Sequence, residues 1–218
     1  MSRSAGKKIT LATPLESAAI NPAPSVAQRS SADEKRPRRK KSTDASPLSE
    51  QHWQDTLLDG THVLIRPIQK ADTELERDFI AHLSPGTRRM RILGQASEPS
   101  DELLRCLTDI DYKHDMAFVA LLHRDGETQE IGASRYGTSI DGKSCECAVT
   151  VSDAWRHRGL ATALMRHLVD YARARGIRKM LSFDSAQNVE MHELAEFLGF
   201  ARAPDPRDAT RVIHTLKL

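Results

Sequence analysis

The chain has 218 residues, with 32 Lys and Arg against 30 Asp and Glu and a formal net charge of +2 at pH 7. Residues 1–50 hold 10 Lys and Arg against 5 Asp and Glu, so the remaining residues carry a net charge of −3. The first aromatic residue is Trp53, and a segment rich in Ser, Ala, Pro and Lys without aromatics buries too little apolar surface to offset its chain entropy. The sequence therefore predicts a disordered basic tail at residues 1–50 and one folded domain at residues 51–218.

The composition argues against several classes of protein. No apolar run is long enough to span a bilayer, and the first 20 residues lack the apolar core of a secretory signal. The three cysteines, Cys106, Cys145 and Cys147, have neither a disulfide framework nor zinc-ligand spacing, so we expect a reduced, cytoplasmic protein without a metal site. The cationic run at residues 35–41 has the charge to contact nucleic acid, but it has no aromatics for base stacking, and a solvated tail explains it equally well.

Apolar periodicity predicts the elements of the folded domain in chain order. Alternating or continuous apolar runs predict strands at residues 62–68, 116–122, 131–136, 145–151, 179–183 and 211–217. Helical spacing predicts helices at residues 72–83, 100–110, 159–175 and 188–198, with residues 87–91 as a polar connection. This order is that of an α/β (α+β) domain, in which a mixed sheet carries helices on both faces.

The stretch at residues 145–162 joins a strand, a basic turn and the start of a helix. The strand ends in the β-branched run at residues 149–151, and the turn contains Arg156-His157-Arg158-Gly159. A helix N-terminus offers unpaired N–H groups and a partial positive charge, which suit a phosphate. Gly159 has no Cβ to keep a ligand away from the backbone. The apolar face of the helix is marked by Leu160, Leu164, Leu168 and Tyr171.

The pattern Arg156-x-x-Gly159-x-Ala161 resembles the acyl-CoA pyrophosphate loop of the GNAT acetyltransferases. A strand-to-helix turn with solvated arginines and no phosphate is the alternative. From about residue 61 the order of elements is also that of the GNAT fold, a central mixed, mostly antiparallel sheet with helices on both faces. The acetyltransferase domain of the bacterial Pat-type protein lysine acetyltransferases is similar at residues 64–67, 83–85, 109–112, 131–136 and 188–200.

The resemblance implies acetyl-CoA as acyl donor, no metal, and direct attack by an amine. Glu146, ten residues before Arg156, matches the position where Pat-like relatives place a glutamate, which makes it the candidate general base. Partial burial beside Cys145 and Cys147 would raise its pKa toward a useful range. The alternatives are an exposed strand glutamate or an ion pair with an arginine such as Arg135.

The same resemblance suggests which residues hold the donor. Backbone N–H groups around Val149 and Val151 would pair with the pantetheine arm, and one would polarise the thioester carbonyl. Asn188 would contact pantetheine, or cap a helix, or both. Ala195 stands where many GNATs have a tyrosine acid and nothing shows that His192 points inward, so no general acid is predicted. The diphosphate would be held by Arg156, His157, Arg158, Gly159, Ala161 and Thr162.

The acceptor expected from the Pat-like pattern is a lysine side chain of a protein. A small amine or polyamine is the alternative, and a domain of charge −3 suits either cation. A degenerate member that binds acyl-CoA as a non-catalytic sensor is a third hypothesis. Retention of both the phosphate loop and Glu146 argues against the sensor.

Overall fold

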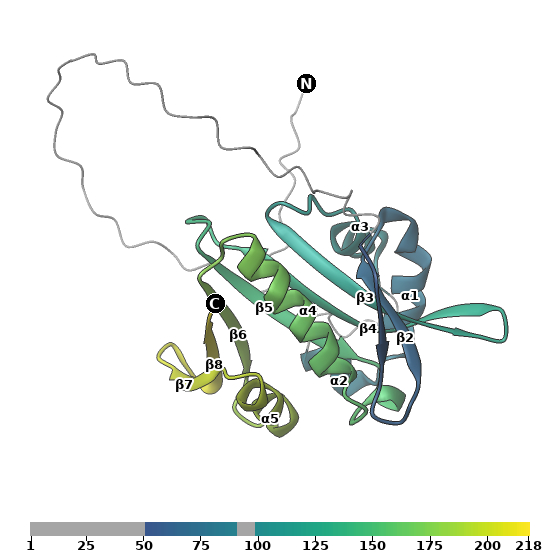
Figure 1. Cartoon of the computed structure of the whole chain (residues 1–218). Helices are drawn as coiled ribbons and strands as arrows, with labels where there is room; N and C mark the ends of the chain where they lie inside the picture. Colours follow the sequence, from purple (N-terminus) through teal and green to yellow (C-terminus); the bar gives the residue numbers. More distant parts are fainter. Residues whose placement is uncertain (1–50, 91–98) are drawn as a thin grey trace, which may run out of the picture.

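A computed structural model describes residues 51–90 and 99–218 (Figure 1). The predicted basic tail at residues 1–50 lies outside the described residues, as does residue 91 of the predicted polar connection. The strands are β1 (Trp53–Thr56), β2 (His62–Pro67), β3 (Asp115–Arg124), β4 (Glu127–Thr138), β5 (Ser144–Val151), β6 (Lys179–Ser185), β7 (Ala201–Asp205) and β8 (Asp208–Lys217). The α-helices are α1 (Thr73–His82), α2 (Pro85–Met90), α3 (Asp101–Thr108), α4 (Leu160–Ala174) and α5 (Val189–Phe197).

One eight-stranded sheet organises the described part of the chain, in the order β1-β2-β3-β4-β5-β6-β8-β7. Every neighbouring pair is antiparallel except β5 and β6, which are parallel and joined through α4. The predicted mixed, mostly antiparallel sheet with helices on both faces is confirmed. The single parallel pair lies in the middle of the sheet, and the candidate site forms beside it.

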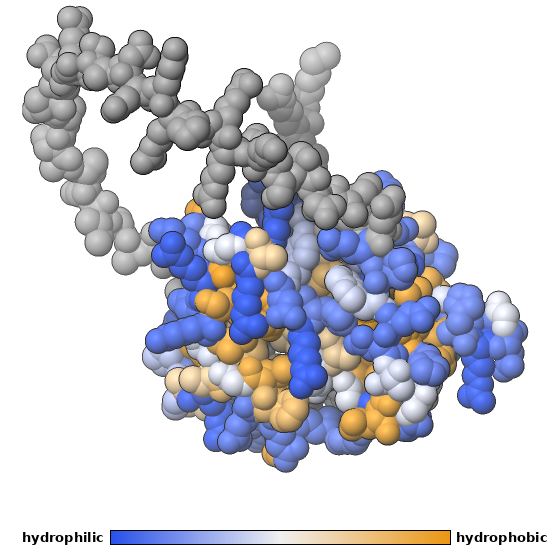
Figure 2. Space-filling model, in the orientation of Figure 1, coloured by the Kyte–Doolittle hydropathy of each residue, from blue (hydrophilic) through white to orange (hydrophobic). Residues whose placement is uncertain are grey.

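Helices cover the two faces of the sheet with separate apolar clusters. Leu164 and Leu168 of α4 and Met191 of α5 pack on one face, and Phe79 of α1 and Leu104 of α3 pack on the other. Strand β3 contributes alternate residues to both clusters, which explains why its sequence is a continuous apolar run. On the face seen in Figure 2 hydrophilic side chains predominate, and apolar ones gather only in small areas.

Local capping explains where several helices begin. The Ser100 side chain accepts a hydrogen bond from the N–H of Leu103 at 3.2 Å, as expected for the N-cap of α3. Asp72 stands at the N-cap position of α1, but its carboxylate makes no cap hydrogen bond there. Both of its oxygens instead accept from the Arg66 guanidinium at 2.7 Å. Asp72 thus holds the N-cap position without capping through its side chain, because a bidentate arginine competes better for the carboxylate.

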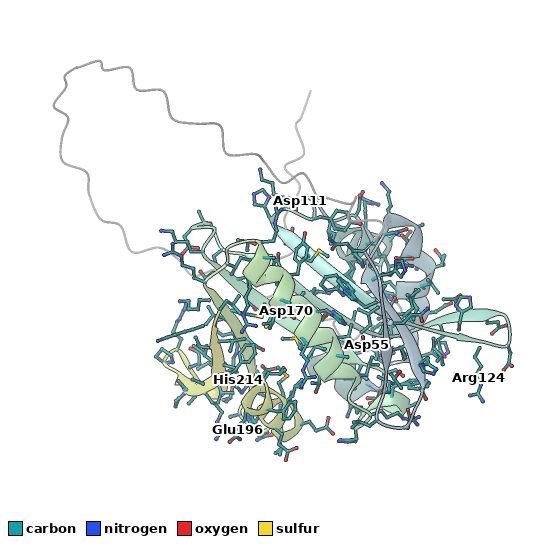
Figure 3. The ribbon with its side chains drawn as sticks, in the orientation of Figure 1. Asp55, Asp111, Arg124, Asp170, Glu196 and His214 are labelled. Carbon is teal, nitrogen blue, oxygen red and sulfur yellow. The ribbon has the colours of Figure 1, made fainter. Side chains whose placement is uncertain are left out.

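Three elements were not predicted. Strand β1 is only four residues long, and Pro204 obscures β7, where the edge position tolerates a proline. Strand β1 is fastened to α4 by Trp53, which stacks on His167, and by Asp55, whose Oδ2 lies 2.9 Å from His167 Nε2 (Figure 3). Helix α2 occupies most of the predicted polar connection and begins at Pro85, a residue suited to the first turn.

Two smaller expectations concern the cysteines and the membrane. Cys145 and Cys147 are buried in the cluster beneath α4, on the opposite face of β5 from Glu146, so they act as packing residues as predicted. None of the described helices has the length and apolar character needed to cross a membrane.

Candidate active site

The site begins where two parallel strands separate. Strands β5 and β6 pair only over three residues, and the last pair joins Glu146 to Leu181. Strand β5 continues for five more residues to Val151, so its edge there faces a cavity of about 530 Å³ instead of a neighbouring strand. Val149, Thr150 and Val151 line this cavity. An unpaired strand edge presents backbone N–H and C=O groups that an extended ligand can bind.

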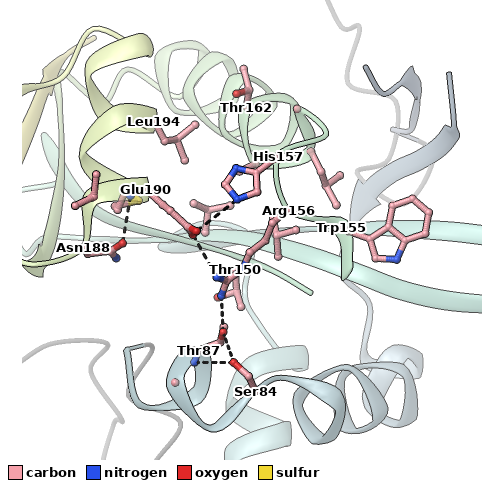
Figure 4. Close-up of a pocket in the computed structure, with 18 of the residues that line it drawn as sticks. Ser84, Thr87, Thr150, Trp155, Arg156, His157, Thr162, Asn188, Glu190 and Leu194 are labelled. Carbon is pink, nitrogen blue, oxygen red and sulfur yellow. Dashed lines mark hydrogen bonds and ion pairs between the residues drawn. The ribbon is translucent and has the colours of Figure 1, made fainter. Parts of the chain in front are cut away.

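The far end of the cavity is the start of α4 (Figure 4). Gly159 is the N-cap residue with a φ of 84°, a left-handed conformation that L side chains rarely adopt, and no side chain caps the helix. His157 is also left-handed, with a φ of 58°. Backbone of this kind turns successive N–H groups toward one point and forms an anion-binding concavity at a helix N-terminus. Gly159 is therefore needed for the shape of the loop, and a Cβ there would also lie 3.2 Å from Cγ of Leu58.

Arg156 is held in a network at the cavity wall. Its Nη2 donates to the Thr87 hydroxyl at 2.6 Å and lies 2.9 Å from Asp153 Oδ1. The Asp153 carboxylate also accepts from the N–H of Ser84 at 2.9 Å, and hydrogen bonds to it lower its pKa against the effect of burial. The network fixes the first turn of α2 to the loop before α4, so Arg156 joins the two elements and faces the cavity.

Arg158 is placed differently from the prediction. Its guanidinium lies 2.6 Å from Asp59 Oδ2 and 4.7 Å from the centre of the Trp155 ring, and Arg158 does not line the cavity. Its carbonyl oxygen accepts a hydrogen bond from the N–H of Leu58. Arg158 thus fastens the β1–β2 connection to the loop. Side chains that are close in the sequence do not all point in one direction. The sequence alone did not show whether Arg156 or Arg158 points away from the cavity.

Helix α5 supplies the opposite wall. The Asn188 side-chain oxygen accepts from the N–H of Met191 at 3.2 Å, which makes it the N-cap, and Asn188 also lines the cavity. The His192 side chain contacts β8, where its Nδ1 lies 3.1 Å from Nε2 of His214. Figure 3 shows the position of His214. Ala195 is buried in the core. Neither His192 nor Ala195 lines the cavity, so His192 is not placed to protonate a leaving thiolate.

Glu146 lies on the face of β5 opposite α4 and is half buried. Burial raises its pKa, the positive charge of Arg211 opposes that rise, and the negative charge of Asp184 adds to it. Arg135 is not its partner, because Arg135 Nη2 lies 3.0 Å from Oε1 of Glu76. Glu146 is not among the residues that line the cavity itself. It lies five residues before Val151, at the point where the pairing of β5 and β6 stops.

Comparison with known proteins decides the family. Residues 87–200 match the model of the acetyltransferase (GNAT) family. A protein of Pseudomonas aeruginosa described as acetyltransferase PA5475 is 53% identical over 167 residues, which cover 77% of this chain and 90% of that protein. The chain is a GNAT-family acetyltransferase. Members of this family take their acetyl group from acetyl-CoA.

Solved structures agree with the GNAT fold. The GNAT domain of S. lividans PAT superposes with a TM-score of 0.69 at 24% identity, covering 77% of this chain and 97% of that one. The yncA protein of Salmonella typhimurium, solved with acetyl-CoA, has a TM-score of 0.53 at 22% identity over 72% of this chain and 94% of that one. At these identities the likeness establishes the fold alone.

The structure brings most of the predicted donor residues of this GNAT enzyme to one cavity. The predicted residues that line it are Val149, Val151, Arg156, His157, Gly159, Ala161, Thr162 and Asn188. Sequence reasoning missed Ser84, which precedes α2, Thr87 on α2, Trp155, and Glu190 on α5. Glu190 lies two residues after Asn188, in the first turn of a predicted helix. Its closeness to a predicted site residue was the signal that could have identified it.

Proposed function

We propose that the enzyme transfers the acetyl group of acetyl-CoA to the side-chain amine of a protein lysine, with Glu146 as general base. The position of Glu146 at the last paired residue before β5 and β6 separate carries this proposal. A donor that binds the start of α4 and runs back along β5 reaches this point after five residues, or about 16 Å of strand. Its reactive end would then meet a half-buried carboxylate whose pKa is raised by burial.

The donor would be bound in two ways. The edge of β5 around Val149 and Val151 would pair with the pantetheine arm in the manner of a neighbouring strand, with Asn188 on the opposite wall. The diphosphate would lie at the start of α4, where unpaired N–H groups and cationic side chains favour an anion. The residues assigned to it are Arg156, His157, Gly159, Ala161 and Thr162. Arg158 is left out because it pairs with Asp59.

The chemical step needs a neutral amine and a polarised thioester. Glu146 accepts a proton from the lysine ammonium, the amine nitrogen attacks the thioester carbonyl, and the carbon–sulfur bond breaks as the carbon–nitrogen bond forms. A backbone N–H of β5 would stabilise the oxyanion without reorganisation. CoA leaves as a thiolate, the nitrogen loses its second proton to water, and water returns a proton to the thiolate. A thiolate is a tolerable leaving group, so the reaction does not need His192 as an acid.

A protein acceptor is supported by the Pat-like sequence pattern, and the charge of −3 on residues 51–218 would attract a cationic lysine. We place the reaction in the cytoplasm, because Cys106, Cys145 and Cys147 form no disulfide within the described residues. A small amine or polyamine is the competing acceptor, and the experiment below separates the two.

The test compares the intact enzyme with Glu146→Gln, using acetyl-CoA and a lysate whose small molecules have been removed by dialysis. We expect both proteins to bind acetyl-CoA, but only the intact one should label lysine side chains and release CoA at a rate that depends on the lysate. Loss of all turnover on dialysis, with recovery on adding back the small molecules, would move the acceptor to a small amine. Equal turnover by the variant would exclude Glu146 as the base.

A further inference from the structure

An acidic side chain lies among the cations of the cavity. Glu190, in the first turn of α5, lines the same cavity as Arg156 and His157 (Figure 4). Its Oε2 accepts from Arg156 Nη1 at 3.3 Å, and its Oε1 lies 3.5 Å from His157 Nε2. Glu190 therefore links α5 to the loop before α4, with one carboxylate oxygen directed to the Arg156 guanidinium and the other to the His157 imidazole.

This carboxylate has the chemical features of the ligand expected at the same place. It is an anion with oxygen acceptors, as a phosphate is. The Nη2 of Arg156 is engaged by Thr87 and Asp153, so Nη1, the nitrogen that pairs with Glu190, is the one that a diphosphate could take. Because the side chain of Glu190 is 54% exposed, it can turn into solvent at little cost when another anion arrives.

We propose that Glu190 is a displaceable internal anion, which occupies the cationic end of the cavity in the free protein and leaves it when the donor diphosphate binds. The inference rests on the proposed function for the assignment of the diphosphate to this loop. Binding then exchanges the contacts of Glu190 with Arg156 and His157 for contacts of the diphosphate, so the affinity for acyl-CoA is lower than it would be without Glu190. A donor that ends at pantetheine has no diphosphate and does not compete with Glu190.

The test measures the dissociation constants of acetyl-CoA and acetyl-pantetheine by calorimetry for the intact protein, Glu190→Gln and Glu193→Gln. Glu193 is exposed on the same helix, so its substitution removes the same charge without touching the cavity. At low salt we expect Glu190→Gln to bind acetyl-CoA about three- to tenfold more tightly, and this gain should shrink as salt rises. Glu193→Gln should stay close to the intact protein, and acetyl-pantetheine should bind equally to all three.

Equal binding of acetyl-CoA by Glu190→Gln and Glu193→Gln would overturn the inference, as would an equal gain for acetyl-pantetheine. These results differ from a failure of the proposed function. If acetyl-CoA did not bind any of the three proteins, the donor assignment and this inference would fall together. If acetyl-CoA bound but Glu146→Gln transferred acetyl groups normally, the catalytic proposal would fail while the displacement of Glu190 could still be measured.

Discussion

Two glutamates on neighbouring strands, Glu130 of β4 and Glu146 of β5, both have pKa values raised mainly by burial. Glu130 is 2% exposed beneath α1, whereas Glu146 is half buried where β5 and β6 separate. A raised pKa is thus not in itself a sign of catalysis. Access for a reacting group distinguishes the two, because Glu146 lies on the strand that borders the cavity, at the point where β5 and β6 separate, while Glu130 lies under a helix.

The neighbours of Glu130 explain its protonation. Glu76 of α1 already pairs with Arg135 at 3.0 Å, so the negative charge of Glu76 adds to desolvation in raising the pKa of Glu130. No other described residue donates a hydrogen bond to either oxygen of Glu130 or to Oε2 of Glu76. A proton on Glu130 supplies the missing donor toward Glu76. We infer that Glu130 keeps its proton in the folded protein to a higher pH than in the unfolded chain.

The same substitution at the two positions should therefore give opposite results, and the largest effect is on catalysis. Replacing Glu146 by Gln removes the general base and should lower kcat/KM for acetyl transfer by about 10²- to 10⁴-fold. Glu130→Gln keeps a neutral hydrogen-bond donor at a position away from the cavity and should retain the rate of the intact enzyme. Steady-state CoA release under one set of conditions measures both. A comparable loss of rate in both variants would show that buried charge, not access, links these residues to activity.

The second-largest effect is the change in stability expected for Glu130→Gln. In the unfolded chain this carboxyl ionises near pH 4.3, whereas the folded state retains the proton to a higher pH. Between these two pKa values the folded state binds more protons than the unfolded chain. The contribution of Glu130 to stability is therefore present at low pH and is lost as the pH rises from the unfolded pKa to the folded pKa. Glu130→Gln cannot ionise and should be more stable than the intact protein at pH 8, by about 1–3 kcal/mol.

Urea unfolding of the two proteins from pH 5 to pH 8 measures this difference. The gain should grow with pH and level off once the pH passes the pKa of Glu130 in the folded protein. A difference that did not change with pH would mean that Glu130 titrates alike in the folded and unfolded states.

The comparison also shows how far sequence reasoning reaches. Periodicity located most of the strands and the long helices, since burial on one face or on both leaves a local pattern. The strand run at residues 149–151 and the Arg156–Gly159 turn pointed to the site because the chemistry there is carried by consecutive residues. Glu146 was selected because it matches the position where Pat-like relatives place a glutamate, ten residues before Arg156. Glu130 was not noticed, because nothing in the local sequence shows that α1 will cover it.

The missing part of the site comes from contacts between distant segments. Thr87 and Asp153 are 66 residues apart and Arg156 and Glu190 are 34 apart, and no local pattern encodes such pairs. The assignment of Arg158 failed for the same reason, since its partner Asp59 is 99 residues away. Sequence order placed the charges in the right loop, and only the fold decided which of them turn toward the cavity.

The smallest effect concerns the tuning of Glu146. Arg211 of β8 lies with its guanidinium 5.2 Å from the centre of the Phe183 ring, and its charge lowers the pKa of Glu146 against the effect of burial. Arg211→Gln should therefore raise that pKa further. A larger fraction of Glu146 is then protonated at a given low pH, and the acid limb of the kcat/KM profile moves to higher pH. The loss of rate should be confined to low pH and stay below about tenfold.

Lys217→Gln is the matched control for this measurement, because Lys217 is an exposed cation at the far end of the same strand. It removes the same charge, but it is not among the charges that shift the pKa of Glu146. The acceptor amine titrates alike with all three proteins, so a displacement of the acid limb seen only with Arg211→Gln belongs to Glu146. An unchanged profile would mean that Arg211 does not tune the base. A loss of rate at every pH would instead assign Arg211 to binding of the acceptor.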